Sequence, residues 1–570
     1  MKNTITLRLQ LLALLVLLPA LGARAGDTLR VAAPLYHRDA AHRLILVNQS
    51  LAALNAGSTE NRQFLALDQV YEFVQPVRTF RTDSAYHVAA GGTTYQLYFT
   101  ALPIIHLDTR HQIADTPSVY ARFALVQPSG ATVRANAGVE YRGASSQAYP
   151  KKSFELSFWD DTTGAASRDV ALLGMRTDNK YNLQAMYNEP LRLRSKVANA
   201  LWLEIHQIYY QAQEPEAKNG IAAEYVEVFV NDEYRGVYAL SERVDRKQLK
   251  LKKYANNTIT GELYKGADWV GGATTFSAVP PFDNRFDTWG GFEYKHPEER
   301  IDWTYLSNFC SFVVSSSDAD FYSSYKQKFH LGNAVDYYLF LNLTRALDNT
   351  GKNLYIAKYK QGEPYYYVPW DLDGVFGTDW SGGYTGSVND ILSNGFYDRL
   401  ERDCSPGGFR ETLRTRWAAL RATVLTEAHI MAKFRANYDY LQGNNVYARE
   451  QLVWSAFRAD SADLASTAAW VRQRLGYLDG EFGQACITAA VRQTPGLLKL
   501  YPNPATEVLR VECTAPAYEL SIRDLNGRVV LQTALKGPQN QVNIGALRAG
   551  LYVVTVQTPT ATATQKLVVE

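Results

Sequence analysis

The chain has 570 residues, enough for about three to four domains of ordinary size with buried cores of their own. Apolar residues make up 46% and aromatic residues 12% of the composition, which is typical of folded protein and excludes a largely disordered chain. The formal net charge is only +2, so the composition indicates no nucleic-acid partner.

The N-terminus carries the pattern of an export signal. An apolar run at 11–18 follows two basic residues, and Ala23 and Ala25 are small residues at the positions that a signal peptidase recognises. The run is shorter than a membrane-spanning helix, and no later stretch offers about 18 consecutive apolar residues. We therefore predict a cleaved signal peptide at 1–25 and a mature protein without a transmembrane helix.

Several common kinds of site have no support in the sequence. The four cysteines, Cys310, Cys404, Cys486 and Cys513, contain no Cys-x-x-Cys pair, and the nine histidines show no metal-ligand spacing. Neither a P-loop nor a Gly-x-Ser-x-Gly motif is present. In an oxidising compartment, one disulfide within the group Cys310, Cys404 and Cys486 is compatible with the sequence, and every pairing stays open.

Residues 26–100 contain short apolar stretches separated by polar turns. Examples are 44–47 and 95–99. Such stretches are typical of short strands, so we predict a β-rich leader.

A longer β-rich region begins at about residue 101. Apolar and polar residues alternate at 119–126 and 154–158, which predicts half-buried strands. The apolar runs 225–230 and 234–241 lie on either side of a short Asn-Asp-Glu turn, which predicts a β-hairpin.

Apolar residues at helical spacing, or a scarcity of glycine and proline, predict three helical regions. They are 190–204, then 333–346 with Asn333 as its candidate N-cap, and finally 411–485. We expect the last region to buttress the catalytic part of the protein.

The loop and hairpin after the second helical region carry acidic residues in a suggestive order. Asp348 and Asn353 lie five positions apart in the loop, strands are predicted at 354–359 and 365–368, and Asp371 follows the second strand. Protein kinases place a catalytic Asp, a metal-binding Asn, a hairpin and a metal-binding Asp in the same order. Because Asp and Asn also favour turns, turn formation alone remains an alternative explanation.

Five short motifs are spread along residues 102–480. They are Tyr141-Arg142-Gly143-Ala144-Ser145-Ser146, Tyr149-Pro150-Lys151-Lys152-Ser153, Val228-Phe229-Val230-Asn231-Asp232-Glu233-Tyr234-Arg235-Gly236-Val237-Tyr238 with Glu242, Gly261-Glu262-Leu263-Tyr264-Lys265, and Val368-Pro369-Trp370-Asp371-Leu372-Asp373. In this order the motifs resemble the spore-coat protein H (CotH) kinase family. The resemblance implies an atypical kinase fold that phosphorylates secreted or coat proteins with ATP and a divalent cation, Mg²⁺ or Mn²⁺.

The resemblance also implies roles for individual residues. Asp348 is the candidate catalytic Asp, Asp371 is the principal metal ligand, and Asp373 and Asn353 are supporting ligands. The family often has an Asp where this chain reads Tyr187-Asn188-Glu189-Pro190, which is a departure in the N-terminal half of the nucleotide site.

A basic residue is expected to contact the nucleotide phosphates. Lys152 is the first candidate, with Glu242 or Glu262 as its acidic partner. Lys265 and Arg142 are alternatives for the same role. An exposed position on a strand is the competing explanation for Lys152.

Residues 499–570 alternate apolar and polar residues in short segments, which predicts a small β-sandwich. Three motifs lie within it: Leu500-Tyr501-Pro502-Asn503-Pro504-Ala505, Asp524-Leu525-Asn526-Gly527-Arg528 and Leu547-Arg548-Ala549-Gly550-Leu551-Tyr552. They resemble the type A sorting domain of the type IX secretion system. This implies passage across the outer membrane of a Bacteroidota-type cell, and an ordinary β-sandwich binding module is the alternative.

Taken together, these patterns predict an α+β protein with four parts. They are a signal peptide (1–25), a β-rich leader (26–100), an atypical protein-kinase-like catalytic domain (101–490) and a C-terminal β-sandwich (499–570). The expected function is that of a secreted or cell-surface kinase that transfers the γ-phosphate of ATP to hydroxyls of proteins in the periplasm or on the cell surface. The type IX secretion machinery is the expected partner of the tail. A catalytically inactive kinase-fold protein that binds or adheres at the surface is the alternative.

Overall fold

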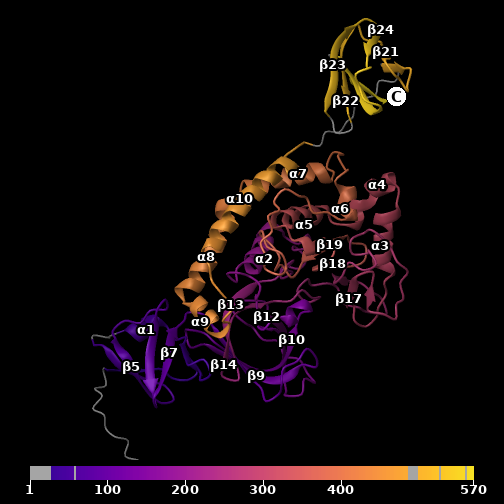
Figure 1. Ribbon diagram of the computed structural model, residues 1–570. Helices are drawn as coiled ribbons and strands as arrows, with labels where there is room; N and C mark the ends of the chain where they lie inside the picture. The colour runs from indigo at the N-terminus through magenta and orange to yellow at the C-terminus, as the bar shows by residue number, and fades with distance from the viewer. Residues whose placement is uncertain (1–26, 57–59, 486–497, 525–527, 559–561) are drawn as a thin grey trace, which may run out of the picture. The chain divides into compact units, whose positions relative to one another are not determined.

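The computed structural model describes residues 27–56, 60–485, 498–524, 528–558 and 562–570 (Figure 1). The predicted signal peptide lies outside these residues. The chain divides into two compact units, of which the first runs to Arg402 and includes Thr412–Gln484, and the second comprises Asp403–Glu411 and Ala485–Glu570. Helices and strands are both abundant, so the fold is mixed α+β, as predicted.

A seven-stranded sheet occupies the N-terminal part of the first unit. Its strands lie in the order β1 (Thr28–Arg30), β4 (Arg62–Ala66), β5 (Val70–Val77), β6 (Ala85–Ala90), β7 (Thr93–Phe99), β3 (Leu44–Val47) and β2 (Tyr36–Asp39). Leu65, Tyr71 and Phe99 are fully buried in its core, which Leu54 of the short helix α1 (Leu51–Asn55) completes. The strands predicted around 44–47 and 95–99 are β3 and β7.

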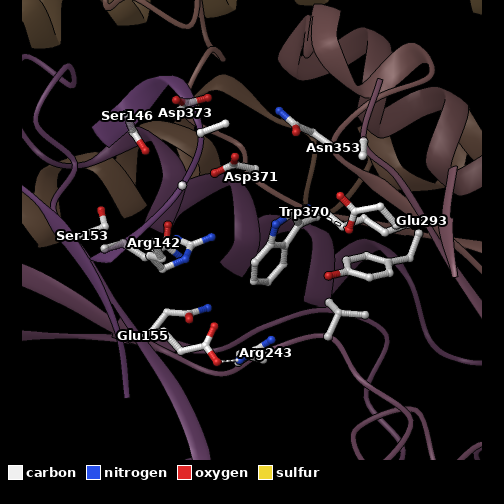
Figure 2. A pocket seen from close by; sticks show the side chains of 18 of the residues that line it. Arg142, Ser146, Ser153, Glu155, Arg243, Glu293, Asn353, Trp370, Asp371 and Asp373 are labelled. Atoms are coloured by element: carbon white, nitrogen blue, oxygen red, sulfur yellow. Dashed lines mark ion pairs between the residues drawn. The ribbon is translucent and has the colours of Figure 1, made fainter. Parts of the chain in front are cut away.

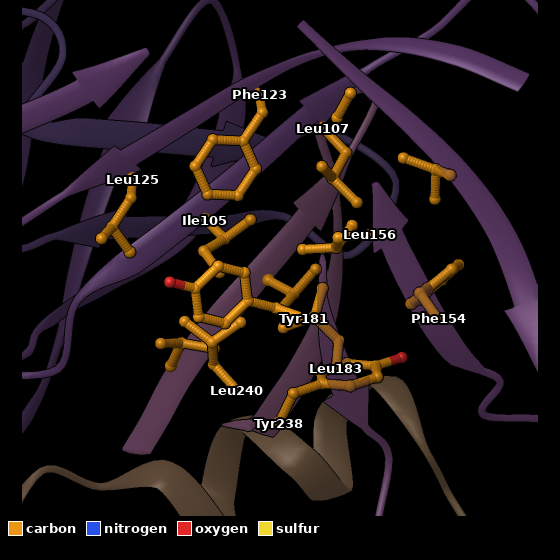
Figure 3. Close-up of a cluster of buried hydrophobic side chains, with 14 of the residues drawn as sticks. Ile105, Leu107, Phe123, Leu125, Phe154, Leu156, Tyr181, Leu183, Tyr238 and Leu240 are labelled. Atoms are coloured by element: carbon orange, nitrogen blue, oxygen red, sulfur yellow. The ribbon is translucent and has the colours of Figure 1, made fainter. Parts of the chain in front are cut away.

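Seven further strands close into a barrel. Their order is β10 (Thr132–Arg142), β11 (Ser153–Trp159), β12 (Lys180–Gln184), β14 (Glu233–Ser241), β13 (Ala223–Val230), β8 (Ile104–Asp108) and β9 (Val119–Val126). Apolar side chains such as Ile105, Leu156 and Leu240 fill the interior (Figure 3). Asn231 and Asp232, with φ of 50° and 64°, form the predicted turn between β13 and β14, because both residue types tolerate the left-handed conformation that tight hairpins require.

A five-stranded sheet and a group of helices complete the central part of the first unit. The sheet order is β16 (Thr288–Trp289), β17 (Phe292–His296), β15 (Glu262–Gly266), β18 (Leu354–Lys358) and β19 (Tyr365–Pro369). The helices are α2 (Arg194–Ile205), α3 (Thr304–Ser315), α4 (Asp318–Lys328), α5 (Leu331–Thr344) and α6 (Gly395–Leu400). Helix α5 packs against β19, so the end of the predicted hairpin lies beside the helix that precedes it.

The predicted N-cap of α5 is wrong. The helix begins at Leu331, and the Nδ1 atom of His330 accepts a hydrogen bond from the backbone N of Asn333 at 3.1 Å. Asn333 is instead buried, where its amide donates to the carbonyl of Tyr367 at 3.0 Å and its oxygen accepts from the N–H of Tyr367 at 2.7 Å. The side chain of Asn333 therefore does not cap α5 but links this helix to strand β19.

The predicted helical region at 411–485 contains α7 (Phe409–Arg421), α8 (Glu427–Gly443), α9 (Val446–Val453) and α10 (Ala462–Phe482). Helix α9 packs against β14 of the barrel, α8 against α2, and α10 against α5. Among the described residues, no helix combines the length and the apolar character that crossing a membrane requires.

The second unit contains two sheets. One has the order β20 (Leu498–Tyr501), β21 (Val508–Cys513) and β24 (Gln539–Asn543); the other has β23 (Val529–Lys536), β22 (Ala517–Arg523), β25 (Gly550–Gln557) and β26 (Thr562–Val569). Both contribute to one apolar core, with Leu509 and Val511 from the first sheet and Ile522 and Val554 from the second.

The cysteines fall into two groups. Cys404 is disulfide-bonded, whereas Cys310 and Cys513 are buried free thiols. Cys486 lies outside the described residues. Cys310 therefore has no place in the disulfide that the sequence allowed.

Candidate functional site

A cavity of about 1400 Å³ lies within the first unit (Figure 2). Its wall comes from the ends of β10, β11 and β12, from β15 and β17, and from the loops that follow α5 and β19. Figure 2 shows Asp371, Asp373 and Asn353 grouped at one side, with the ring of Trp370 between Arg142 and Glu293. Residues far apart in the sequence, from the barrel to the second hairpin, thus share one hollow.

The loop at 348–353 begins with a single turn of 3-10 helix, η3 (Leu347–Thr350), and both Asp348 and Asn353 line the cavity. Its shape depends on the buried side chain of Asn349, which donates to the carbonyl of Asn353 at 2.5 Å and to the carbonyl of Trp370 at 2.9 Å. The N–H of Trp370 also donates to the carbonyl of Asn353 at 3.0 Å. Asn349 therefore fastens the loop that carries Asp348 to the segment that carries Asp371, a role that sequence reasoning missed.

Asp371 and Asp373 flank the buried Leu372 and both line the cavity. Asp371 and Asn353 adopt left-handed backbone conformations, with φ of 53° and 54°. Non-glycine residues are uncommon in this region, and such strain is often found at functional sites. The backbone thus aims two oxygen-bearing side chains at the cavity at some conformational cost.

Three of the acids that line the cavity, Asp348, Asp371 and Asp373, influence one another. Burial, together with the nearby charge of Asp371, holds the pKa of Asp373 well above its usual range. Burial also raises the pKa of Asp348; Lys352 opposes this effect, and Asp371 adds to it. The amide of Asn188 donates to Asp373 at 3.4 Å. Asp371 therefore acts electrostatically on both of the other acids.

Lys265 of β15 lines the same cavity. It pairs in register with Glu293 of β17, and its ammonium lies 3.7 Å from the Glu293 carboxylate. Burial lowers the pKa of Lys265, and Glu293 opposes this shift. Glu293 also binds Lys295 at 2.7 Å. Sequence reasoning missed Glu293, because nothing local indicates that β17 lies beside β15.

Arg142 and Gly143 form another edge of the cavity. Arg142 ends β10, and its guanidinium carbon lies 5.6 Å from the centre of the Trp370 ring. Gly143 has a φ of 101°, and a Cβ atom there would overlap Oγ of Ser146. The Arg-Gly-Ala-Ser-Ser motif therefore needs glycine for both its backbone conformation and its close packing.

Two predicted phosphate-site residues lie elsewhere. Lys152 is absent from the cavity wall, and its ammonium donates to the carbonyl of Gln147 at 2.5 Å. Glu242 is buried and accepts from Lys218 at 2.7 Å, away from both Lys152 and the wall. Glu262, the other suggested partner, is buried and accepts from Tyr365 at 2.5 Å.

Lys151, next to Lys152, does belong to the wall but is committed to a buried ion pair. Its ammonium donates to Glu450 of α9 at 2.7 Å and to the carbonyl of Val237 at 2.6 Å. Arg192 lies on the other oxygen of the same carboxylate at 3.3 Å. Burial lowers the pKa of Lys151 to about 8, and Glu450 opposes this shift. Helix α9 thus holds the segment between the Ser-Ser motif and β11.

Among the residues that the structure describes, no three His, Cys, Asp or Glu side chains gather closely enough to hold a metal ion alone. The two aspartates of the 371–373 segment would therefore need further oxygen ligands. The side-chain oxygen of Asn353 is one candidate, and ligand phosphates and water are others.

Comparison with known proteins identifies the family. The family model described as CotH kinase protein matches residues 139–478, which contain the cavity, and the model of the secretion system C-terminal sorting domain matches 499–570. The inner spore coat protein H of Bacillus subtilis (strain 168) is 22% identical over 313 residues, which cover 54% of this chain and 77% of that protein. The chain therefore belongs to the CotH kinase family, as its motifs predict, and its C-terminal sorting domain indicates secretion by the type IX system to the cell surface or beyond.

Proposed function

We propose that this protein is an exported phosphotransferase with a kinase-like catalytic domain, which moves the γ-phosphoryl group of ATP to a hydroxyl of a protein in the periplasm or on the cell surface. The observation that carries the proposal is the meeting of Asp348, Asn353, Asp371 and Lys265 in one cavity. Residues 1–25 would direct export across the inner membrane, and the sorting domain would direct passage across the outer one.

Asp348 is the proposed general base. Its carboxylate lines the cavity, and burial raises its pKa, which makes it a better proton acceptor than an exposed Asp. In phosphoryl transfer such a carboxylate orients the attacking hydroxyl and accepts its proton. Asn349 would keep Asp348 at a fixed place relative to Asp371 through its two hydrogen bonds.

Asp371, Asp373 and Asn353 would hold a divalent cation, Mg²⁺ or Mn²⁺. Their donors are the carboxylate and amide oxygens that such cations prefer, and Mg²⁺ is commonly bound by one or two carboxylates plus substrate phosphates. When bound, such a cation would supply positive charge that offsets the negative charge developing on the phosphoryl group during transfer. Burial first and the charge of Asp371 second raise the pKa of Asp373, and a nearby cation would offset both effects.

Lys265 and Arg142 are the proposed phosphate contacts. Both line the cavity, and the Glu293 carboxylate keeps the Lys265 ammonium directed along the wall. A lysine acts as a point charge toward phosphate, whereas arginine offers a planar fork of donors. This choice replaces Lys152, whose ammonium is bonded to a backbone carbonyl outside the wall.

The test is transfer from radiolabelled ATP by the full secreted chain, compared with its Asp371→Asn variant. Asparagine tolerates the left-handed backbone of residue 371, so the substitution removes charge with little backbone strain. We expect transfer to fall at least about 100-fold. The matched control is Asp232→Asn, which makes the same chemical change at another residue of positive φ, exposed in the β13–β14 turn.

If Asp371→Asn transferred phosphate at the wild-type rate, the proposed role of Asp371 as a metal ligand would be contradicted. Absence of transfer in the wild type, together with no nucleotide-dependent rise in melting temperature, would favour the inactive surface-binding alternative.

A further inference from the structure

Three large apolar side chains lie uncovered in the cavity wall or next to it. Trp269 is 43% exposed and Trp380 is 55% exposed, and both line the cavity, so they stand where it meets solvent. Leu347 is 53% exposed and immediately precedes Asp348. Isolated exposed apolar residues are normal, but two in the wall of one cavity and a third next to a residue of that wall indicate a binding surface.

Trp269 is held rigidly although it is exposed. The N–H of Val270 donates to the Asp268 carboxylate at 2.8 Å, and the N–H of Gly272 donates to the Trp269 carbonyl at 3.2 Å. A Cβ atom at Gly351 would lie 3.1 Å from Cδ1 of the Trp269 ring, so the ring packs against the 348–353 loop. The Lys352 ammonium lies 5.5 Å from the ring centre. A fixed, half-exposed indole of this kind can bind at low entropic cost.

Trp380 is fixed beside Asp373. Its carbonyl accepts from the Asn188 amide, which also donates to Asp373. Asp379 accepts from the N–H groups of Ser381 and Gly383 at 2.8 and 3.1 Å, which closes the turn that presents Trp380. Its place thus depends on the segment that carries the proposed metal ligands.

The position of two of these side chains, Leu347 and Trp269, points to the acceptor and not to the nucleotide. The proposed phosphate contacts, Arg142 and Lys265, come from the strands β10 and β15, whereas Leu347 and Trp269 adjoin the loop of the proposed base. A polypeptide whose hydroxyl reaches Asp348 must bring the residues next to that hydroxyl past Leu347. Apolar side chains there would be buried against the exposed surface.

We propose that Trp269, Leu347 and Trp380 form a docking surface for the acceptor polypeptide, which selects a Ser or Thr flanked by apolar side chains. The inference rests on the proposed function for the role of Asp348. It adds a substrate class: a polypeptide segment with an apolar residue beside the phosphorylated hydroxyl.

The test uses two degenerate peptide libraries with a central Ser or Thr. The flanking positions are drawn from Leu, Val and Phe in one library and from Asn, Gln and Gly in the other. Transfer is measured with the full secreted chain at saturating ATP. Binding of the same fluorescently labelled libraries is measured by anisotropy without ATP. The variants are Trp269→Ala and Leu347→Ser, and the control is Phe286→Ala, which removes an aromatic ring that is 59% exposed and outside the cavity wall.

We expect kcat/KM to favour the apolar library at least about tenfold, as burial of an aromatic contact predicts. Trp269→Ala and Leu347→Ser should abolish most of this preference through the KM for peptide, with the KM for ATP unchanged, whereas Phe286→Ala should retain it. Equal use of the libraries, or a rise in the KM for ATP in Trp269→Ala, would overturn the docking surface.

The two measurements separate this inference from the proposed function. Absence of transfer, with binding that favours the apolar library and depends on Trp269, would refute the phosphotransferase and support the docking surface. Transfer that does not distinguish the two libraries would support the phosphotransferase and refute the docking surface. Absence of both transfer and preferential binding would overturn both proposals.

Discussion

Replacing Glu450 by glutamine removes the carboxylate that two buried cations, Lys151 and Arg192, share. Breaking a buried ion pair by removing one partner costs about 3–5 kcal/mol. Glutamine can still accept from the N–H of Val237, now 2.6 Å from Glu450. We therefore expect a loss of about 3–4 kcal/mol in the free energy of unfolding.

Urea unfolding followed by tryptophan fluorescence measures this loss selectively. All ten tryptophans lie in the first unit and none in residues 485–570, so the signal reports on the first unit alone. The matched control is Glu216→Gln, which removes the exposed partner of Lys250. Exposed pairs contribute little, so this change should leave the urea midpoint nearly unchanged.

The pH dependence supplies a second check. The pKa of Lys151 is about 8 in the folded protein and 10.5 as its ordinary value, so between these pH values the unfolded chain binds a proton that the folded chain has lost. Stability from this group therefore rises with pH across that window. Glu450→Gln removes the opposing anion and should extend the window below pH 8. A loss under about 1 kcal/mol at pH 7, with no change in slope, would refute the reasoning.

Three further substitutions test the site and the leader. Lys265→Met should slow transfer at least about tenfold more than Lys152→Met, because only Lys265 lines the cavity; equal losses in parallel rate assays would count against this. Gly143→Ala should raise the Kd for ATP at least about tenfold in calorimetric titration, because its Cβ would collide with Ser146, and unaltered affinity would argue otherwise. Burial lowers the pKa of His37 to about 3, so as the pH falls below 6.5 the unfolded chain binds a proton that the folded chain does not, and stability falls. His37→Phe should make the urea midpoint fall less steeply with pH. An unchanged slope would speak against this reasoning.

The elements that could be predicted from the sequence are those with local patterns. The hairpin of β18 and β19 lies within two residues of its predicted bounds, because aromatic and β-branched runs flank a short polar turn. Closure of the barrel could not be predicted. It depends on the parallel pairing of β8 with β13, in which Ile104 lies opposite Glu227, and neither strand carries a pattern that identifies a partner so far away in the chain.

The choice between Lys151 and Lys152 shows where the pattern contained more information than the interpretation used. In β11, Phe154 and Leu156 face the barrel core, whereas Ser153 and Glu155 line the cavity. The two-residue period of a strand, continued backward, places Lys151 on the cavity side and Lys152 on the other. The two-residue alternation of the strand therefore contradicts the choice of Lys152. It could not show that Lys151 forms an ion pair with Glu450 of α9.

Asn349 marks the limit of sequence reasoning about the site itself. Placed after Asp348 in a polar loop, it looks like one more turn-forming residue. In the structure it is buried, and its amide binds the carbonyls of Asn353 and Trp370, which lie 4 and 21 residues away along the chain. The pairing of Leu354 with Pro369 in the hairpin brings the two segments together, and the Asn349 amide then fixes the loop of Asp348 against them. A pattern can identify which carboxylates are candidates, but a tertiary hydrogen bond decides that they face one cavity.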